Sequence, residues 1–245
     1  MQYPKVILDA CIRSNIAYIS PHTMKRMWAS SKMILGEREG KKHPYDIGNV
    51  FRDVESEPIF INIGTGAKAY TWRKDRTLYV TFRGMHGLNI HDIKANIDIR
   101  HHRIGNHGKV QKGYWMYSNS IFQDLMNQID SQDISTIEFT GHSMGSTLAA
   151  LSAFNLSLNT RNIDIRCHVF GGPKFCDRVF SDKFMRIVPN SSHTIIKGDF
   201  VPEIYNGFEH CIQNLHIHDE KDKDLNFLEK HSCMYYIKFL QALIP

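Results

Sequence analysis

The chain has 245 residues and a formal net charge of +5, with 42% hydrophobic and 22% charged residues. This balance is typical of a globular protein with a large core, and it excludes a disordered chain. No apolar run approaches the length of a membrane span, and no recognised nucleic-acid motif accompanies the basic charge, so neither a spanning helix nor nucleic-acid binding is expected.

Two helices and three short strands are predicted in the first third of the chain. Apolar residues at near-helical spacing predict an amphipathic helix over residues 4–18, and residues 22–35 resemble a second helix. Residues 36–58 are rich in charge, glycine and proline, which indicates irregular surface. A turn at Lys74-Asp75 separates the last two of three predicted strands, which are Ile59–Ile63, Ala67–Arg73 and Leu78–Phe82.

Predicted strands and helices alternate in the rest of the chain. The helices are expected at about Tyr117–Ile129, Ser146–Leu156, Arg178–Arg186 and Ser232–Leu243. The strands are expected at Ile137–Thr140, Ile165–Phe170 and Thr194–Ile196. Strands that alternate with helices indicate a mostly parallel central sheet with helices on both faces. Because there is no repeat, linker or low-complexity tract, residues 1–245 are expected to form a single α/β domain.

A cluster of basic residues precedes the first of these later helices. Its members are Arg100, His101, His102, Arg103, His107, Lys109 and Lys112. Such a cluster can attract an anionic membrane surface or phosphate groups. It can equally be a solvated loop, because charge runs of this length are common on protein surfaces. The sequence leaves both interpretations open.

The motif Gly-His-Ser-Met-Gly at residues 141–145 is the sharpest chemical signal in the chain. A bare G-x-S-x-G pattern is weak, but here a β-rich run enters it and a small-residue helix leaves it, as in a nucleophile elbow. The turn would lift the Ser143 hydroxyl above the sheet, and the two glycines would let strand and helix pass closely. The backbone N–H of Met144, at the start of the helix, would then point towards an oxyanion.

A nucleophilic serine needs an oriented base, and in such sites the acid and then the histidine follow it in the chain. Asp199 lies just after the predicted strand Thr194–Ile196, at the carboxyl end where sites on parallel sheets collect. His231, the last histidine, lies just before the final helix and is expected to be the base. The competing acids are Asp164, Asp177 and Asp182, and the competing bases are His193, His210, His216 and His218.

Three of these rival histidines lie at informative positions. His193 is expected ahead of its strand, at the wrong end of the sheet for a base. His216 and His218 alternate, so they would share one face of a strand and could form a metal pair. Solvated histidines at a sheet edge are the more common explanation of that pattern. No metal site and no cofactor are therefore expected.

Five short blocks between residues 78 and 202 resemble the class 3 lipases, the fungal triacylglycerol lipase-like family of α/β-hydrolases. They are Leu78–Gly84, Val110–Tyr114, Thr140–Leu151, Phe170–Pro173 and Asp199–Pro202, and together they cover roughly residues 67–236. Each block is modest alone, but their order and spacing are specific. The resemblance implies an α/β-hydrolase fold and a serine hydrolase that cleaves carboxylic esters of lipids, such as acylglycerols, through an acyl-enzyme on Ser143.

The resemblance also implies roles for other residues. His231 would take the proton of Ser143 and pass it to the leaving alcohol, and Asp199 would orient the imidazole. Met85 would supply the second oxyanion donor from its backbone N–H, where the family usually has Ser or Thr. Two further departures from the family pattern are Gln111, in place of a histidine, and Ser146, in place of a glycine.

The segment after this expected oxyanion residue forms a lid in the family. Here residues 86–97 carry an apolar helical stripe of Ile90, Ile93 and Ile97. An ordinary packed helix would produce the same stripe, so the sequence does not separate a lid from a fixed helix.

Two other functions are compatible with these residues. A phospholipase A-type acyl hydrolase is favoured by the basic cluster, and a catalytically idle binding module is disfavoured by the complete triad. The expected partners are a lipid ester substrate and, peripherally, a membrane or lipid interface. The apolar run Val6–Leu8 is broken by Asp9, so no signal peptide is predicted, and five cysteines without a Cys-x-x-Cys pair argue against a disulfide framework. A cytoplasmic location is expected.

Overall fold

The computed structural model describes residues 3–33, 54, 57–62, 67–84, 98–130, 133–219 and 224–244. Met85 and the predicted lid at residues 86–97 lie outside the described residues, as does most of the segment 36–58.

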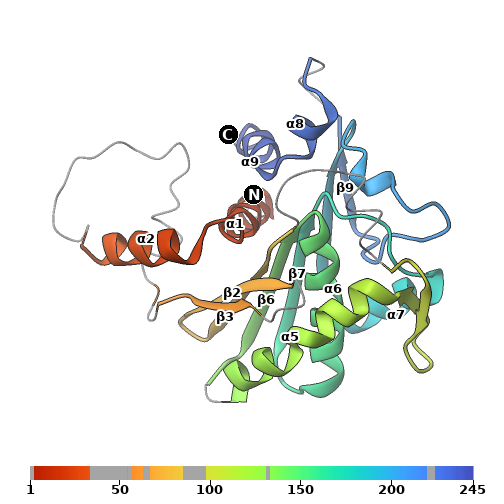
Figure 1. Ribbon diagram of the computed structural model, residues 1–245, viewed down its shortest axis with the longest axis horizontal. Helices are drawn as coiled ribbons and strands as arrows, with labels where there is room; N and C mark the ends of the chain where they lie inside the picture. Colours follow the sequence, from red (N-terminus) through yellow and green to blue (C-terminus); the bar gives the residue numbers. More distant parts are fainter. Residues whose placement is uncertain are drawn as a thin grey trace.

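A mostly parallel sheet of seven strands forms the centre of the described structure (Figure 1). The strands at one edge, β1–β2 and β2–β3, pair antiparallel, and every pair from β3 onwards is parallel. In spatial order the strands are β1 (Ile59–Asn62), β2 (Lys68–Lys74), β3 (Thr77–Phe82), β6 (Thr136–His142), β7 (Asp164–Phe170), β8 (Asn190–Ile196) and β9 (Leu215–His218).

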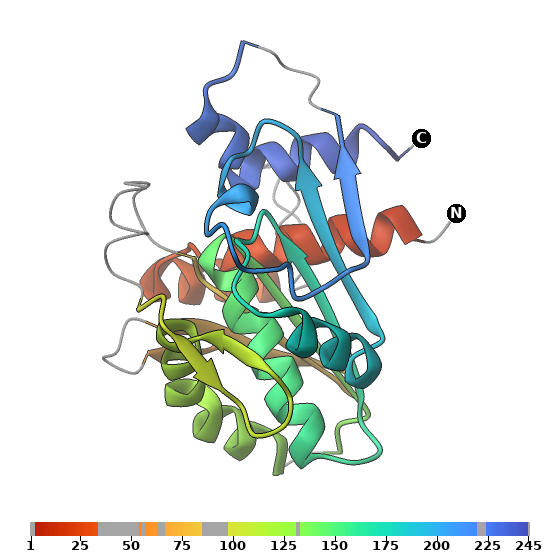
Figure 2. The same ribbon diagram turned by 90° about the vertical axis from the view of Figure 1, so that its right-hand side faces the viewer.

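Helices cover both faces of this sheet, as Figures 1 and 2 show. One face carries α5 (Lys112–Asp130), α6 (Met144–Asn159) and α7 (Arg178–Ile187). The other face carries α1 (Tyr3–Ile16) and α9 (Cys233–Gln241), which pack against each other although they lie at opposite ends of the sequence. The remaining helical segments are α2 (Pro21–Met33), the short 3₁₀ helix Val201–Glu203 and α8 (Phe227–His231).

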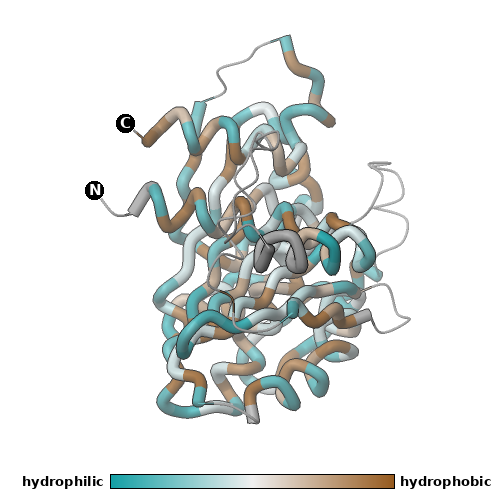
Figure 3. The backbone as a smooth tube through the Cα atoms, turned by 90° about the vertical axis from the view of Figure 1, so that its left-hand side faces the viewer, coloured by the Kyte–Doolittle hydropathy of each residue, from teal (hydrophilic) through white to brown (hydrophobic). Residues whose placement is uncertain are grey.

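The buried core is divided between the two faces. Phe139, Leu148 and Phe154 belong to the cluster beneath α5, α6 and α7, whereas Trp72 and Phe170 belong to the cluster beneath α1 and α9. Each such side chain contributes about 1.5–3 kcal/mol of burial free energy. Hydrophobic and hydrophilic stretches alternate along α1 and α9 (Figure 3), as expected for helices with one buried face.

A buried ion pair also fixes α1 to the sheet. Arg13 of α1 pairs with Glu138 of β6, and its guanidinium lies 4.7 Å above the ring of Tyr79 on β3. The hydroxyl of Thr81 donates to the Arg13 carbonyl at 3.0 Å. Both partners of the pair are mostly buried, so removal of either one would leave an uncompensated charge.

Most predicted elements are present, and two differ in a way that matters for the site. Helix α5 begins at Lys112, not Tyr117, and β8 begins at Asn190, not Thr194. The prediction that His193 lies ahead of its strand is therefore wrong, because His193 lies within β8. The polar pair Ser191 and Ser192 hid the start of this strand, yet both serines are buried, and the Ser192 hydroxyl lies 2.8 Å from His168 Nδ1.

The basic stretch forms an antiparallel hairpin of β4 (His101–Arg103) and β5 (Lys109–Gln111). Gly108, at φ 106°, closes the hairpin tip against the start of α7, where a Cβ would overlap the backbone nitrogen of Phe180. That nitrogen donates to the Asp177 side chain, which caps α7, at 2.8 Å. Packing against α7 therefore orders this stretch. Among the described residues, no helix combines the length and the apolar character needed to cross a membrane.

Candidate active site

Ser143 occupies the sharp turn between β6 and α6, as predicted. Its backbone has φ 60° and ψ −132°, a conformation that costs a non-glycine residue about 1–3 kcal/mol. Glycine is required on both sides, because a Cβ at Gly141 would overlap the Gly145 carbonyl and one at Gly145 would overlap the carbonyl of Phe82. The chain thus bears local strain that projects the serine from the carboxyl end of the sheet.

The three predicted triad side chains form one hydrogen-bonded chain. The Ser143 hydroxyl lies 2.8 Å from His231 Nε2, and His231 Nδ1 lies 2.9 Å and 2.8 Å from the two carboxylate oxygens of Asp199. All three residues are buried, with exposed fractions of 2%, 0% and 4% for Ser143, His231 and Asp199. Because the Asp199 carboxylate accepts a hydrogen bond from Nδ1–H, the proton of the neutral imidazole stays on Nδ1. Nε2 is then the acceptor that faces the serine.

Two different local structures deliver the acid and the histidine. Asp199 follows β8 in a short turn through Gly198, at the carboxyl end where it was expected. His231 ends α8, which begins with a capping box between Asn226 and Glu229. The cap fixes the start of a helix only five residues long, and so fixes the position of the histidine at its other end.

Further donors hold the Asp199 carboxylate. The Tyr236 hydroxyl of α9 donates to Oδ2 at 2.7 Å, and the backbone N–H of Val201 donates to Oδ1 at 3.0 Å. Burial and the nearby Asp199 charge raise the pKa of Tyr236 well above its usual value, so the tyrosine stays a donor. Gly171, at φ 55°, leaves room for this arrangement, since a Cβ there would lie 2.9 Å from Oδ2. No sequence motif marks Tyr236, because the contact depends on how α9 packs on β8.

The expected oxyanion donors are described in part. Met144 is the first residue of α6, directly after Ser143, which is the predicted place for a donor. Met85 lies outside the described residues, but Gly84 is described, and a Cβ on it would lie 3.2 Å from the Cβ of Ser143. The end of β3 therefore reaches the nucleophile turn. The donor role of Met85 and Met144 stays a prediction.

The rival acids and histidines have other structural partners. Asp164 and Asp182 pair with arginines, and Asp177 caps α7. His193 Nε2 accepts from the Gly172 N–H at 3.0 Å, and its ring lies 5.0 Å from that of His210. His216 and His218 lie on the edge strand β9, where the His218 ring packs against Phe239. Among the described residues, no group of three histidine, cysteine or acidic side chains is placed to hold a metal ion.

The two other departures from the family pattern have structural partners outside the triad. The Gln111 amide nitrogen donates to the Lys174 carbonyl at 3.3 Å. The Ser146 hydroxyl lies 3.1 Å from the Gly141 carbonyl and 2.9 Å from the Phe170 carbonyl, so it joins the nucleophile turn to the end of β7.

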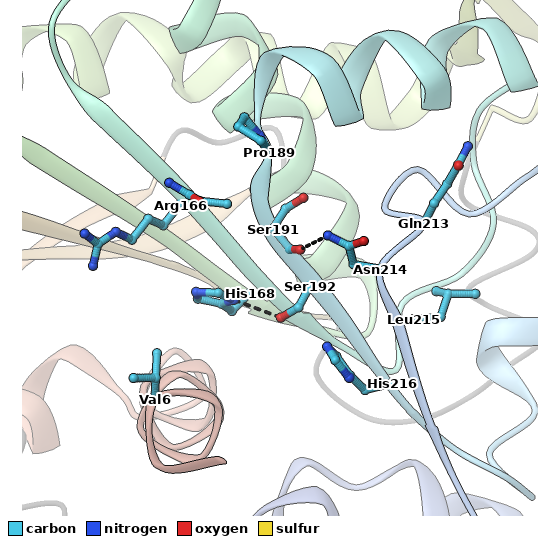
Figure 4. Close-up of a pocket in the computed structure, with 11 residues that line it drawn as sticks. Val6, Arg166, His168, Pro189, Ser191, Ser192, Gln213, Asn214, Leu215 and His216 are labelled. Atoms are coloured by element: carbon cyan, nitrogen blue, oxygen red, sulfur yellow. Dashed lines mark hydrogen bonds between the residues drawn. The ribbon is translucent and has the colours of Figure 1, made fainter. Parts of the chain in front are cut away.

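A cavity of about 770 Å³ lies at the other end of the sheet (Figure 4). Its lining includes His168 of β7, Ser192 of β8 and His216 of β9, with Val6 of α1 opposite them. Ser143, His231 and Asp199 lie at the carboxyl ends of the strands, so this cavity is separate from them.

Comparison with known proteins agrees with this geometry. The sequence profile of the family described as Lipase (class 3) matches residues 79–208. A secreted mono- and diacylglycerol lipase of Malassezia globosa is 24% identical over 95 residues, which are 38% of this chain and 31% of that protein. The aligned segment thus spans about a third of the curated relative.

Solved fungal lipases share the fold. The Lip2 lipase of Yarrowia lipolytica superposes with a TM-score of 0.66 at 18% identity, over 89% of this chain and 79% of that chain. The triacylglyceride lipase of Rhizomucor miehei gives 0.66 at 17% identity, over 84% and 76% of the two chains. These likenesses confirm the predicted α/β-hydrolase fold.

The expected cytoplasmic location is wrong by the same comparison, since the curated relative is a secreted lipase. The unpaired cysteines were therefore a poor guide to the location. All five cysteines are buried, and burial raises the pKa of thiols such as Cys11 and Cys211, which makes them unreactive.

Proposed function

Since the chain belongs to the class 3 lipase family, we propose that it is a serine hydrolase that cleaves the carboxylic ester bonds of lipids. One observation carries the proposal. The unbroken chain of short contacts from Ser143 through His231 to Asp199 lies buried at the carboxyl end of a parallel sheet. Nucleophile, base and orienting acid in this arrangement are the minimum for acyl transfer.

The reaction has two steps. In the first, the Ser143 oxygen attacks the ester carbonyl while His231 Nε2 removes its proton, and the histidine then gives that proton to the leaving alcohol. In the second, His231 activates water, which releases the fatty acid and restores the serine. Asp199 holds the imidazole in the required tautomer and stabilises the imidazolium in both steps.

The negative charge on the carbonyl oxygen needs backbone donors. We assign this role to the N–H groups of Met144 and Met85. The position of Met144 at the start of α6 supports the first assignment, and the approach of Gly84 to the nucleophile turn supports the second. The family's usual Ser or Thr hydroxyl is missing at Met85, but a backbone N–H is independent of the side chain, so activity is expected to persist.

Acylglycerols are the proposed substrates, met at a lipid interface. The family match supports this choice, as do the fungal lipases that share the fold. A phospholipase A-type activity remains the second candidate, supported by the basic hairpin β4–β5. The ordered triad argues against an idle binding module. The single sheet shared by both cores, and the packing of α1 on α9, support one domain over residues 1–245.

Substitution of the triad tests the function directly. Ser143→Ala and His231→Ala should each abolish hydrolysis of a short-chain chromogenic ester, and Ser143→Ala should also abolish labelling by a fluorophosphonate. Asp199→Asn should reduce turnover by about 10⁴-fold, on the precedent of the trypsin triad, because it stabilises the wrong histidine tautomer. Since the three residues act as a unit, combined substitutions should be no worse than the worst single one.

Ser157→Ala is the matched control, because this serine lies on α6, the helix that follows Ser143, and its hydroxyl donates to the Ala153 carbonyl. It should keep both activity and labelling. Wild-type protein that neither hydrolyses esters nor reacts with the fluorophosphonate would contradict the proposal. Parallel assays on a diacylglycerol and on phosphatidylcholine separate the two candidate substrate classes.

A further inference from the structure

Tyr18 is a partly buried tyrosine in the turn that follows the N-terminal helix α1, and its hydroxyl lies between two parts of the active site. The hydroxyl oxygen is 2.9 Å from His142 Nδ1. It also lies against Gly84, the residue at the end of the β3 side of the site. A Cβ on Gly84 would overlap this hydroxyl, so the contact is possible only with glycine at that position.

The bond between Tyr18 and His142 joins a phenol to an imidazole nitrogen, and it forms between the neutral side chains. Burial, and then the neighbouring His231, hold the pKa of His142 well below its usual value, while the His231 backbone carbonyl opposes this shift. Burial also raises the pKa of Tyr18. Both side chains are therefore neutral, which this pairing requires.

The Tyr18–His142 pair lies beside the end of β3, the nucleophile turn and the ring of His231. Gly84 immediately precedes Met85 in the chain, and His142 immediately precedes Ser143. The ring of His142 packs on the ring of His231, with 4.7 Å between centroids and 33° between the planes. One hydroxyl thus links the end of β3 to the nucleophile turn, and through a ring contact to the base.

We propose that Tyr18 is a positioning residue, whose hydroxyl sets the separation between the end of β3 and the nucleophile turn so that the oxyanion donor on the β3 side meets the tetrahedral intermediate. The inference rests on the proposed hydrolase function. Donors of this kind act only when they lie about 2.7–3.1 Å from the oxyanion, so a small widening of the gap weakens them. An interaction that is made only in the transition state affects kcat and leaves KM nearly unchanged.

Tyr18→Phe tests the proposal, with Tyr70→Phe as its matched control. Tyr70 lies on β2, and its hydroxyl donates at 2.9 Å to the carbonyl of Ile19, next to Tyr18. The control therefore removes a tyrosine hydroxyl that contacts the same turn and leaves the contacts of Tyr18 with Gly84 and His142 in place. On a soluble short-chain ester, Tyr18→Phe should lower kcat at least tenfold with KM within twofold of wild type. It should weaken binding of an alkyl boronic acid, which forms a tetrahedral adduct on Ser143, by the same factor as kcat. The control should retain both values.

His142→Phe provides the second variant, because it keeps an aromatic ring beside His231 but cannot accept from Tyr18. It should lower kcat by a similar factor, and the Tyr18→Phe/His142→Phe pair should be no slower than the slower single variant. This variant decides the matter if Tyr18→Phe does not fold.

The outcomes distinguish a failure of the proposed hydrolase function from a failure of the positioning role of Tyr18. A wild-type protein without ester hydrolysis contradicts the proposed function. An active wild type in which Tyr18→Phe has the kcat of Tyr70→Phe, or in which the losses of the two variants multiply, contradicts the positioning role alone.

Discussion

Two neighbouring tyrosine hydroxyls on α9 differ in whether they have a hydrogen-bond partner. The Tyr236 hydroxyl donates to the buried Asp199 carboxylate at 2.7 Å. The next residue towards the N-terminus, Tyr235, is also buried, but its hydroxyl has no hydrogen-bond partner among the described residues. A hydrogen bond to a charged group is worth about 1.5–3 kcal/mol, whereas a buried hydroxyl without a partner is a cost. Adjacent tyrosines on α9 therefore have opposite effects on stability.

This contrast predicts the outcome of two conservative substitutions. Tyr236→Phe should lower the free energy of unfolding by about 1.5–3 kcal/mol and should also slow ester hydrolysis, because Asp199 loses a donor that fixes its carboxylate. Tyr235→Phe, the control, should be neutral or stabilising and should leave hydrolysis unchanged. Urea unfolding curves and turnover of a soluble ester measure both effects. Equal stability losses in the two variants would show that the Tyr236 contact is unimportant.

In the hairpin β4–β5 and the residues beside it, several of the basic side chains have partners within the protein. Arg100 is paired with Asp98, and the rings of His101 and His102 stack on Phe208 and Trp115. Arg103 is exposed on the hairpin. Part of the apparent charge is thus occupied by local contacts, and the hairpin offers fewer cations to a lipid surface than the sequence suggests.

Attraction of the hairpin to anionic lipid remains a prediction. Binding to vesicles that contain an anionic phospholipid should weaken as salt rises, because counter-ions screen surface charges beyond about 10 Å at 0.1 M salt. Arg103→Glu should reduce this binding. Arg161 is also exposed, but it precedes the amino end of β7 and so lies at the opposite end of the sheet from the triad. Arg161→Glu should therefore reduce vesicle binding less than Arg103→Glu. Indistinguishable binding to neutral and anionic vesicles at all salt concentrations would return the hairpin to a structural role.

Several histidines are buried in the folded protein, where burial favours the neutral imidazole. Burial is the main cause that lowers the pKa of His142 and His193 well below the usual value, and it lowers the pKa of His210 to about 4. A histidine with a depressed folded pKa contributes its full stability above the unfolded pKa of about 6.5. Below that pH the unfolded chain binds protons that the folded chain does not, and stability falls.

The expected loss is about 1.4 kcal/mol for each fully buried histidine between pH 7.5 and pH 5.5. Urea unfolding at these two pH values measures it. His193→Gln keeps an acceptor for the Gly172 N–H, so the difference between the two pH values should shrink by about 1.4 kcal/mol. Substitution of the exposed His22 by Gln should not change it. An equal free energy of unfolding at both pH values in the wild type would be inconsistent with neutral buried histidines.

Local sequence was sufficient wherever chemistry and chain order restrict the choice. The glycines around Ser143 mark the strained turn, because only residues without a Cβ fit where β6 and α6 pass. Asp199 and His231 could be proposed because the acid follows a strand and the histidine precedes the last helix, and the structure brings both side chains into one chain of contacts with Ser143. Helices such as α6 were predicted since nearly every residue in them is apolar or small. The strand β8 was predicted too short because its first residues are polar, although they are buried.

Local patterns and a recurring motif were sufficient to predict the fold class and to propose Ser143, Asp199 and His231 as a triad, because each depends on residues close together in the chain. Tertiary structure alone decided the contacts that hold those residues. Tyr18 and His142 are 124 residues apart in the sequence, and Tyr236 and Asp199 are 37 residues apart. Each pair comes into contact only when α1 and α9 pack on the same face of the sheet. The hairpin β4–β5 is likewise ordered where Gly108 meets α7. Such contacts follow from the docking of whole elements, and no local pattern records them, because a buried tyrosine hydroxyl is compatible with many partners until packing selects one.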